Sequence, residues 1–527
     1  MQVRWHPNCH LDHRIPANWV GSVDSNLAAS APVVQLSNLA GENRLTFALA
    51  EASRMVKINT GICEETCEIA VSIELFSVPE APLTDYETVL RLDWRTIFYA
   101  DALRNAFAWF ATFPEYLPAV APDAAFEPIY SSWYSYHQNL FDHQLESECQ
   151  LAREYGLKGI IVDDGWQTDD TNRGYAFCGD WEVSLCRFPD MRAHVTKVHQ
   201  MGMKYVVWYS VPFVGEKSKN LPRFRAMTLY RIDTLNTYVL DPRFPEVRQF
   251  LIGTYEKALQ EWDIDGFKLD FIDSFRFEGE DPAIKDNYAG RDIQSLPEAV
   301  DRLLSDTMNY LRRIKPDILI EFRQSYIGPA VRKYGNMLRV GDCPGDILSN
   351  RVGSINLRLS SGYTAVHSDM LEWHPQETPE SAARQLLNVL FAVPQISVRL
   401  EELPDDHRRM LRFWLCFWRD HRYVLMHGKL NPSQPELNYP QVSADNQTEQ
   451  VIAVYGSGQK ITVSGEPGKT YYLVNAGGDE ELIMALNGPP NHVTCHDVLG
   501  NKIPTGGLPS GLAAVKVPIS GLLTLQY

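Results

Sequence analysis

IDGFKLDFID, residues 264–273, is the stretch that decides the fold of this chain. Its apolar positions carry branched and aromatic side chains and follow a helix-like segment at 245–262, which is typical of a buried parallel strand. Because charges are costly inside such a strand, Lys268 and Asp270 should lie at its carboxyl end, where it emerges. Catalytic residues of α/β barrels lie at that end of the strands. Asp270 is therefore the first candidate for a nucleophile.

The strand is one of a series of apolar runs that alternate with helix-like segments over roughly 300 residues. The series consists of IYSSWYS (129–135), LKGIIVDD (157–164), KYVVWYS (204–210), IDGFKLD (264–270), DILIEFR (317–323), NMLRVGD (336–342), YTAVHSD (363–369) and QISVRLE (395–401). Eight strands that alternate with helices predict a (β/α)8 TIM barrel, of the α/β class.

Two β-rich regions flank this series. Residues 1–122 contain CEIAVSIELFSV (67–78), whose alternating apolar and polar residues are typical of a half-buried strand. A Pro- and Ala-rich linker (116–128) leads into the predicted barrel. The end of the chain has short strands between Gly, Pro and Asn turns. We expect an N-terminal β-rich, sandwich-like domain (1–122), a catalytic barrel (123–431) and a C-terminal β-sandwich (432–527).

Composition narrows the class of partners. The 527 residues are 45% hydrophobic and 22% charged, as in ordinary globular proteins, and the net charge is −17. A strongly acidic chain is a poor ligand for nucleic-acid phosphates or anionic membranes, so neither is expected as a partner. The nine cysteines are scattered without a metal-binding pattern, which predicts reduced thiols, no metal site and a cytoplasmic location. The first residues have no apolar run typical of a secretory signal.

Polar residues end most of the predicted barrel strands, and in a barrel these ends meet at one mouth. The residues expected there are Asp163, Asp164, Asp270, Arg323, Asp342 and Asp369. An acidic pocket without metal ligands favours carboxylate chemistry on a neutral, hydroxyl-rich substrate. Glycoside hydrolysis is such a reaction, because it needs one protonated and one ionised carboxyl group beside the scissile bond.

Lys268 lies two residues before Asp270, so both side chains should point to the same face of the strand. A cation there lowers the pKa of the carboxyl group and makes Asp270 the better nucleophile, although the pair could instead be purely structural. Asp265 lies near the amino end of the strand, where a structural role is expected. Asp273 lies beyond the strand, where capping of a following loop or helix is expected.

Several motifs together resemble glycoside hydrolase family 36, the family of microbial α-galactosidases, which is related to families 27 and 31. They are VDDGWQ (162–167), GDWE with RFPD (179–190), HQMGMKYVVW (199–208), YVLDPRFPEVR (238–248) and GFKLDF (266–271). The resemblance covers roughly residues 100–430. It implies a retaining mechanism, with the nucleophile at the end of strand four and the acid/base residue at the end of strand six.

By motif, the resemblance assigns the nucleophile to Asp270 and the acid/base residue to Asp342, in RVGDCPGD. Asp346 is a rival acid, but it follows Pro-Gly, where a loop or N-cap role is expected. The resemblance also implies substrate-binding roles for a further set: Asp163, Asp164, Trp166, Trp208 and Lys268. Trp208 could instead be a core residue, and one of the paired aspartates could cap a loop.

One segment departs from the family. Many of its members have Cys-Ser-x-Gly-Gly-Gly-Arg after strand five, where this chain has EFRQSYIGP (321–329). Arg323 and Gln324 change the size and hydrogen bonding of the pocket, so galactose specificity does not carry over directly. Arg323 could bind an anionic sugar substituent, or hold an acidic neighbour such as Asp342 in place, which we favour. Asp369 is a further candidate contact, and His367 a weaker one.

The sequence thus predicts a cytoplasmic, retaining α-glycosidase that needs no cofactor. Its substrate would be a small oligosaccharide or glycoside with a terminal α-linked sugar, most simply α-galactose. Another sugar such as N-acetylgalactosamine, galactosyl transfer, and a non-catalytic sugar-binding protein remain alternatives. Association into a homo-oligomer is also open.

Overall fold

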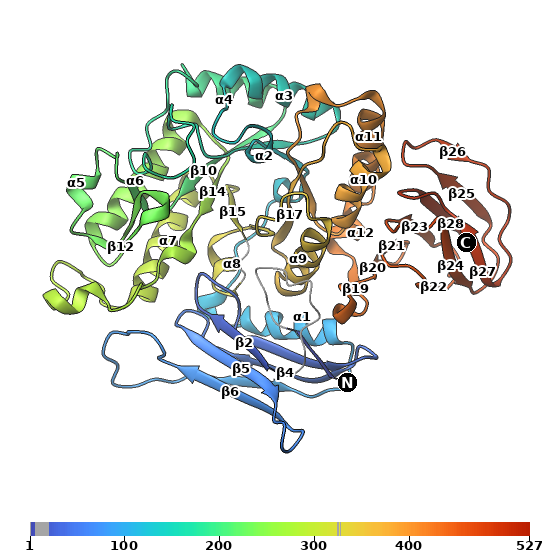
Figure 1. The fold of residues 1–527 in the computed structure, drawn as a ribbon, viewed down its shortest axis with the longest axis horizontal. Helices are drawn as coiled ribbons and strands as arrows, with labels where there is room; N and C mark the ends of the chain where they lie inside the picture. Colours follow the sequence, from blue (N-terminus) through green and yellow to red (C-terminus); the bar gives the residue numbers. More distant parts are fainter. Residues whose placement is uncertain (1, 6–19, 324–325, 327) are drawn as a thin grey trace.

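The computed structural model describes residues 2–5, 20–323, 326 and 328–527. Figure 1 shows two β-rich regions beside a central α/β unit, one formed by the start of the chain and one by its end. The central unit is a closed barrel of eight parallel strands in the order β10-β14-β15-β16-β17-β18-β8-β9. This confirms the predicted TIM barrel.

Each of the eight predicted apolar runs overlaps one barrel strand, although β17 extends two residues beyond its run and β18 begins two residues before its run. The strands are β8 (Ile129–Ser131), β9 (Gly159–Val162), β10 (Lys204–Ser210), β14 (Gly266–Asp270), β15 (Leu319–Arg323), β16 (Met337–Arg339), β17 (Ala365–Leu371) and β18 (Val393–Ile396). These strands are almost entirely buried, since helices cover the outside and side chains fill the interior. Six of the strands are shorter than their runs, because several motifs continue into the loops at the mouth, whereas β10 and β17 are as long as theirs.

The main barrel helices are α3 (Asp142–Glu154), α4 (Met191–Gln200), α6 (Pro245–Trp262), α7 (Leu296–Ile314), α9 (Ile347–Ser360), α10 (Pro379–Asn388) and α11 (Asp405–Asp420). Shorter ones are α2 (Trp133–Tyr136), α5 (Leu221–Phe224), α8 (Val331–Tyr334) and α12 (Arg422–His427). Helix α6, just before the deciding strand, starts at a proline and ends at Asp263 in the left-handed region. These local signals fix where the chain turns back into β14.

Two features were not anticipated from the sequence. A small antiparallel sheet, β11 (Phe213–Gly215), β13 (Thr237–Leu240) and β12 (Thr228–Ile232), is inserted after β10. Helix α1 (Tyr99–Phe110) lies within the first 122 residues and packs its buried face against the barrel side of the N-terminal sheet. Its apolar residues are mainly Ala and Phe at helical spacing, a pattern that the β-rich surroundings obscured.

The flanking regions each contain two facing sheets. The N-terminal sheets are β1 (Gln2–Trp5), β3 (Val33–Asn38), β4 (Asn43–Leu49) and β7 (Leu90–Asp93), and β2 (Val20–Ser25), β5 (Val56–Ile62) and β6 (Ile69–Leu75). The larger C-terminal sheet comprises β19 (Lys429–Pro432), β20 (Gln441–Asp445), β21 (Glu449–Val454), β23 (Thr470–Asn475), β28 (Leu522–Gln526), β25 (His492–His496) and β26 (Lys502–Ile503). The smaller one comprises β22 (Lys460–Val463), β24 (Glu481–Leu486) and β27 (Gly511–Lys516). Apolar side chains from both sheets form one core in each region, as in a sandwich.

The barrel interior is layered. An apolar layer near the amino ends of the strands takes side chains from six strands: Ile129, Ile161, Val206, Leu319, Met337 and Ala365. Charged and polar side chains follow toward the carboxyl ends. Such burial is tolerated only where the groups pair with one another, so this polar layer positions the site. Among the described residues, every helix is too short or too polar to cross a membrane.

Candidate active site

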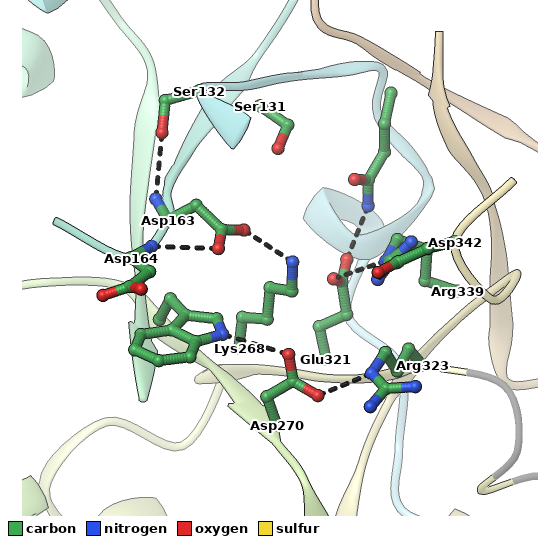
Figure 2. Close-up of polar contacts among 12 residues, drawn as sticks. Ser131, Ser132, Asp163, Asp164, Lys268, Asp270, Glu321, Arg323, Arg339 and Asp342 are labelled. Atoms are coloured by element: carbon green, nitrogen blue, oxygen red, sulfur yellow. Dashed lines mark hydrogen bonds and ion pairs between the residues drawn. The ribbon is translucent and has the colours of Figure 1, made fainter. Parts of the chain in front are cut away.

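Asp270 ends β14, and its carboxylate is saturated with hydrogen-bond donors (Figure 2). Its Oδ1 accepts from Arg323 Nε at 2.6 Å, from the Phe271 amide at 2.8 Å and from the Tyr326 hydroxyl at 3.3 Å. Its Oδ2 accepts from Trp208 Nε1 at 3.1 Å. These donors fix the carboxylate in one orientation at the mouth of the barrel.

The same surroundings keep Asp270 ionised. Burial by itself raises the pKa of a carboxyl group, but the charges of Arg323 and Lys268 outweigh it and hold the pKa of Asp270 well below its ordinary value. The predicted effect of Lys268 is therefore confirmed. A carboxylate that stays ionised and oriented at this position has the properties required of a nucleophile.

Lys268 itself pairs with a different aspartate. Its Nζ lies 2.5 Å from Asp163 Oδ2, and both side chains are buried. Two further hydrogen bonds hold Asp163 in place. Its amide donates to Ser132 Oγ at 3.0 Å, and its Oδ1 accepts from the Asp164 amide at 2.9 Å. Lys268 therefore bridges β14 to the end of β9 and acts on Asp270 through its charge.

Asp164, the second member of the VDD motif, is also buried. Its carboxylate accepts from Gln138 Nε2 at 2.5 Å and from Gln167 Nε2 at 2.7 Å. Burial raises its pKa to about 6, although both amide bonds oppose the shift. Asp164 is thus held by neutral donors, unlike Asp163, and can exchange a proton near neutral pH.

The two predicted tryptophans occupy different places. Trp208 contacts Asp270 and stacks on Tyr175, with their ring centroids 5.8 Å apart. Trp166 is fully buried, stacks on Trp181 and donates from Nε1 to the Trp208 carbonyl at 3.0 Å. Trp166 therefore supports the position of Trp208 from the core rather than facing the carboxylates.

Asp342 follows β16, and 53% of its side chain is exposed. Arg339 Nη2 donates to its Oδ1 at 2.8 Å. Partial burial raises its pKa, but Arg339 and Lys268 outweigh this effect and hold the pKa of Asp342 below its ordinary value. The charge of Asp270 raises the pKa of Asp342, so the two carboxylates lie close enough to interact electrostatically.

Asp369, in β17, lies on the other side of the same arginine. It is fully buried, bonds Arg339 Nη1 and accepts from the Cys343 amide at 2.7 Å and the Tyr134 hydroxyl at 2.9 Å. Burial raises the pKa of Asp369, and the nearby Asp342 charge adds to this. Asp369 therefore contacts both Arg339, which binds Asp342, and the loop that carries Asp342.

Arg339 and Glu321 are site residues that the sequence reading missed. Arg339 is buried on β16, and its Nε lies 3.5 Å from Glu321 Oε1 on β15. Glu321 is also fully buried and accepts from Gln395 Nε2 at 2.5 Å. The available signal was the charge itself: a lone Arg or Glu within a buried strand must have a partner on a neighbouring strand.

Arg323 is placed beside Asp270, whereas the sequence favoured Asp342 as the acidic residue that it holds. Arg339 bonds Asp342 instead, because it ends β16 only three residues before Asp342. Burial disfavours the Arg323 cation, yet Asp270 raises the pKa of Arg323 well above its ordinary value. Gln324, its predicted companion, lies outside the described residues.

The remaining candidates have structural contacts. His367 Nε2 lies 2.8 Å from the Ala125 carbonyl in the barrel interior. Asp346 is the N-cap of α9, accepting from two amides, as expected. Asp265 bonds His199, Lys204 and the Tyr205 amide at the amino end of β14, and Asp273 accepts from Tyr326 at 3.0 Å.

Part of the chain is similar in sequence to known proteins. Residues 125–321 match the family model described as Melibiase. Probable alpha-galactosidase G of Emericella nidulans is 27% identical over 157 residues, which cover 27% of this chain and 22% of that protein. The bifunctional alpha-galactosidase/sucrose kinase AgaSK of Mediterraneibacter gnavus is 28% identical over 207 residues, 37% of this chain and 20% of that protein. The chain thus matches only about a fifth of the length of these relatives.

The fold agrees over more of the chain. A variant of the GH36 alpha-galactosidase AgaA of Geobacillus stearothermophilus, solved in complex with raffinose, matches with a TM-score of 0.65. The match covers 97% of this chain and 72% of that one at 13% identity, so it shows the fold alone. The chain thus resembles the Melibiase family model over residues 125–321, and over nearly its whole length it shares the fold of this GH36 alpha-galactosidase.

Proposed function

We propose that this protein is a retaining glycoside hydrolase that removes a terminal α-linked sugar, most simply α-galactose, from a small oligosaccharide or glycoside. The observation that carries the proposal is the ionised, fully oriented carboxylate of Asp270 at the end of β14. A second, exposed carboxyl group, Asp342, lies at the end of β16, close enough to interact with Asp270 electrostatically. One ionised and one proton-carrying carboxyl group are the two groups that this reaction needs.

In the first step, Asp270 attacks the anomeric carbon while Asp342 gives a proton to the departing oxygen, so a glycosyl-enzyme forms. In the second step, Asp342 takes a proton from water, and the hydroxide oxygen displaces Asp270 from the sugar. Two inversions at the anomeric carbon give net retention. This mechanism requires the two carboxyl groups to be about 5–5.5 Å apart.

Asp342 must carry a proton when the first step begins, although Arg339 favours its ionised form. One guanidinium, however, faces three carboxyl groups, those of Asp342, Asp369 and Glu321. The pKa values of the two buried members, Asp369 and Glu321, lie above their ordinary values, because burial outweighs the charge of Arg339. The proposal requires Asp342, the exposed member, to take up a proton in this cluster and pass it to the substrate. No metal or organic cofactor takes part in this scheme.

The choice of galactose rests on the melibiase match and on the names of the relatives. The raffinose bound to AgaA supports an oligosaccharide as substrate. Arg323 lies against the carboxylate that would attack the sugar, so another sugar, such as N-acetylgalactosamine, or galactosyl transfer remains the second candidate. We also propose that four residues near the carboxylates bind the sugar: Asp163, Asp164, Trp208 and Lys268.

A panel of nitrophenyl α-glycosides tests the function. We expect release from the α-galactoside, with the α-anomer of the sugar as first product by NMR. No release from the galactoside would overturn the choice of sugar, and a β-anomer as first product would overturn retention. Asp270→Asn should bind sugar without turning it over. A wild type that binds but hydrolyses no glycoside would instead support the sugar-binding alternative.

Three further proposals concern the whole protein. The eight cysteines among the described residues are free thiols, which supports a cytoplasmic location, testable by cell fractionation. We also propose three domains, at 1–122, 123–431 and 432–527. Limited proteolysis tests these bounds, since cleavage is expected between domains. Association into a homo-oligomer is testable by light scattering.

A further inference from the structure

A cavity lies at the opposite end of the barrel from Asp270. Its volume is about 370 Å³, within the usual range for small-ligand sites. It is bounded by α1, α8, the end of α9, the turn at 362–364 before β17, and the start of β19, elements that meet below the barrel in Figure 1. Because the turn at 362–364 precedes β17, the cavity lies at the amino ends of the barrel strands.

The lining of this cavity is basic. Five side chains on its wall can carry positive charge: Arg104, Arg332, Arg358, His427 and Lys429. None of the described residues that line it is acidic. Arg104 and Lys429 share Asp101, which lies outside the lining. This concentration of cations contrasts with the strongly acidic chain as a whole, whose net charge is −17.

Two of the arginines have no anionic partner. Within the described part of the chain, neither Arg332 nor Arg358 forms an ion pair. Arg332 is 1% exposed, donates from Nη2 to the Phe107 carbonyl at 3.0 Å and has no partner for its buried Nε. Arg358 donates only to backbone carbonyls and the Met426 sulfur.

Burial lowers the pKa of both guanidinium groups to about 10, so both remain charged at neutral pH. A buried charge without a counter-ion is costly, and a bound anion removes that cost. A planar guanidinium also matches the oxygens of phosphate in a two-pronged contact.

The other walls are apolar and aromatic. Phe107, Phe126 and Tyr363 line the cavity together with Met426. Apolar walls with a few convergent polar groups are typical of sites for small organic ligands. The space therefore has room for an organic body next to a charged group.

We propose that this cavity binds the phosphate group of a small phosphorylated metabolite through Arg332 and Arg358. Such a ligand would connect α1 of the N-terminal region, the lower end of the barrel and β19 of the C-terminal sheet. Binding to the folded state alone raises the melting temperature by mass action. The proposed anion site is independent of the glycosidase proposal, because it uses none of the residues at the mouth.

The test uses the full chain, with calorimetric titration and thermal melts in inorganic phosphate, glucose 6-phosphate, citrate and neutral glucose. We expect glucose 6-phosphate to bind and raise Tm, and glucose to have no effect. Phosphate alone should bind more weakly. Binding of citrate but not of either phosphate would overturn the phosphate assignment, and no binding of any anion up to about 10 mM would overturn the site.

Three variants make the test specific. Arg332→Gln should weaken glucose 6-phosphate binding about tenfold or more, because one charge-assisted contact is lost. Because Arg332 is buried, a second variant, Ala108→Glu, keeps the test decisive if Arg332→Gln does not fold; it adds a carboxylate at an exposed lining position of α1. Ala108→Glu should abolish binding while keeping the fold.

Arg302→Gln is the matched control, since Arg302 is an exposed arginine paired with Asp306 on α7. It should leave the affinity unchanged. Unchanged affinity in Ala108→Glu, or an equal loss in Arg302→Gln, would overturn the assignment.

Discussion

Arg323 Nε lies 2.6 Å from Asp270 Oδ1, in the carboxylate at the end of β14. Arg323 belongs to EFRQSYIGP (321–329), the segment in which this chain differs from the family that it resembles. The contact joins β15 to β14 at the barrel mouth. It stabilises the ionised form of Asp270 and also occupies one side of its carboxylate. The same arginine therefore supports the charge of the proposed nucleophile and limits what can approach it.

Removal of the Asp270 carboxylate should abolish hydrolysis. We expect Asp270→Ala to lower kcat for a nitrophenyl α-galactoside by about 10⁴-fold or more, because no covalent intermediate can form. Added azide should restore turnover and give the β-glycosyl azide, identified by NMR. An α-configured azide product, or substantial activity without azide, would contradict the role of Asp270.

Loss of the Arg323 charge should shift the pH profile. Arg323 lowers the pKa of Asp270, so Arg323→Gln raises that pKa, and the acidic limb of kcat/KM moves to higher pH. Loss of a charge-assisted hydrogen bond should also reduce kcat/KM about 10–100-fold. Arg323→Lys should restore the position of the limb more than the rate. A variant with lower activity but an unmoved limb would show that Arg323 acts through packing alone.

The contribution of Asp342 should depend on the leaving group. Asp342→Asn cannot supply a proton, so hydrolysis of an alkyl α-galactoside should fall about 10²–10⁴-fold. A dinitrophenyl galactoside needs little protonation and should be affected much less in its first step. Equal losses for both substrates, measured by pre-steady-state kinetics, would exclude Asp342 as the acid.

Arg339 should be essential for stability. Arg339→Met leaves Asp369 and Glu321 buried without their cation, and breaking such a cluster costs about 3–5 kcal/mol. The exposed Arg302–Asp306 pair provides the control, for which Arg302→Gln should cost less than about 1 kcal/mol. Urea unfolding measures both. Similar costs for the two variants would contradict the importance of the Arg339 cluster.

Glu148, away from the site, should make stability depend on pH. It is buried on α3 and accepts from the Leu400 amide at 3.0 Å and the Tyr136 hydroxyl at 3.1 Å. Burial raises its pKa from 4.5 to about 7. Its contribution to stability is therefore full below pH 4.5 and is lost as the pH rises through 7.

Glu148→Gln removes this titration and keeps a carbonyl oxygen for the Leu400 amide. Relative to wild type, the variant should gain up to about 3 kcal/mol of unfolding free energy between pH 4 and pH 8. Urea unfolding across that range provides the measurement. Parallel pH profiles for the two proteins would show that Glu148 titrates normally.

The barrel was predictable because each of its strands is a short apolar run of the right length. The deciding strand, β14, showed this most clearly, with Asp270 where the apolar run ends. Helix α1 and the β11–β13 insertion were missed, because short elements within a β-rich region or a loop carry weak periodicity. At the site, Asp270 and Asp342 could be predicted because they are charged residues at strand ends. Arg339 and Glu321 were not predicted, because they pair between neighbouring strands that are distant in sequence.

The sequence by itself determined the class of fold and the strand ends that carry carboxylates, since burial restricts charges to the ends of apolar strands. Only the tertiary structure decided which charge meets which. Lys268 pairs with Asp163, Arg323 with Asp270, and Arg339 with Asp342 and Asp369. The physical reason is that these ion pairs, apart from the local pair Arg339–Asp342, form between different strand ends of the barrel, so the register between strands, and not spacing along the chain, selects those partners.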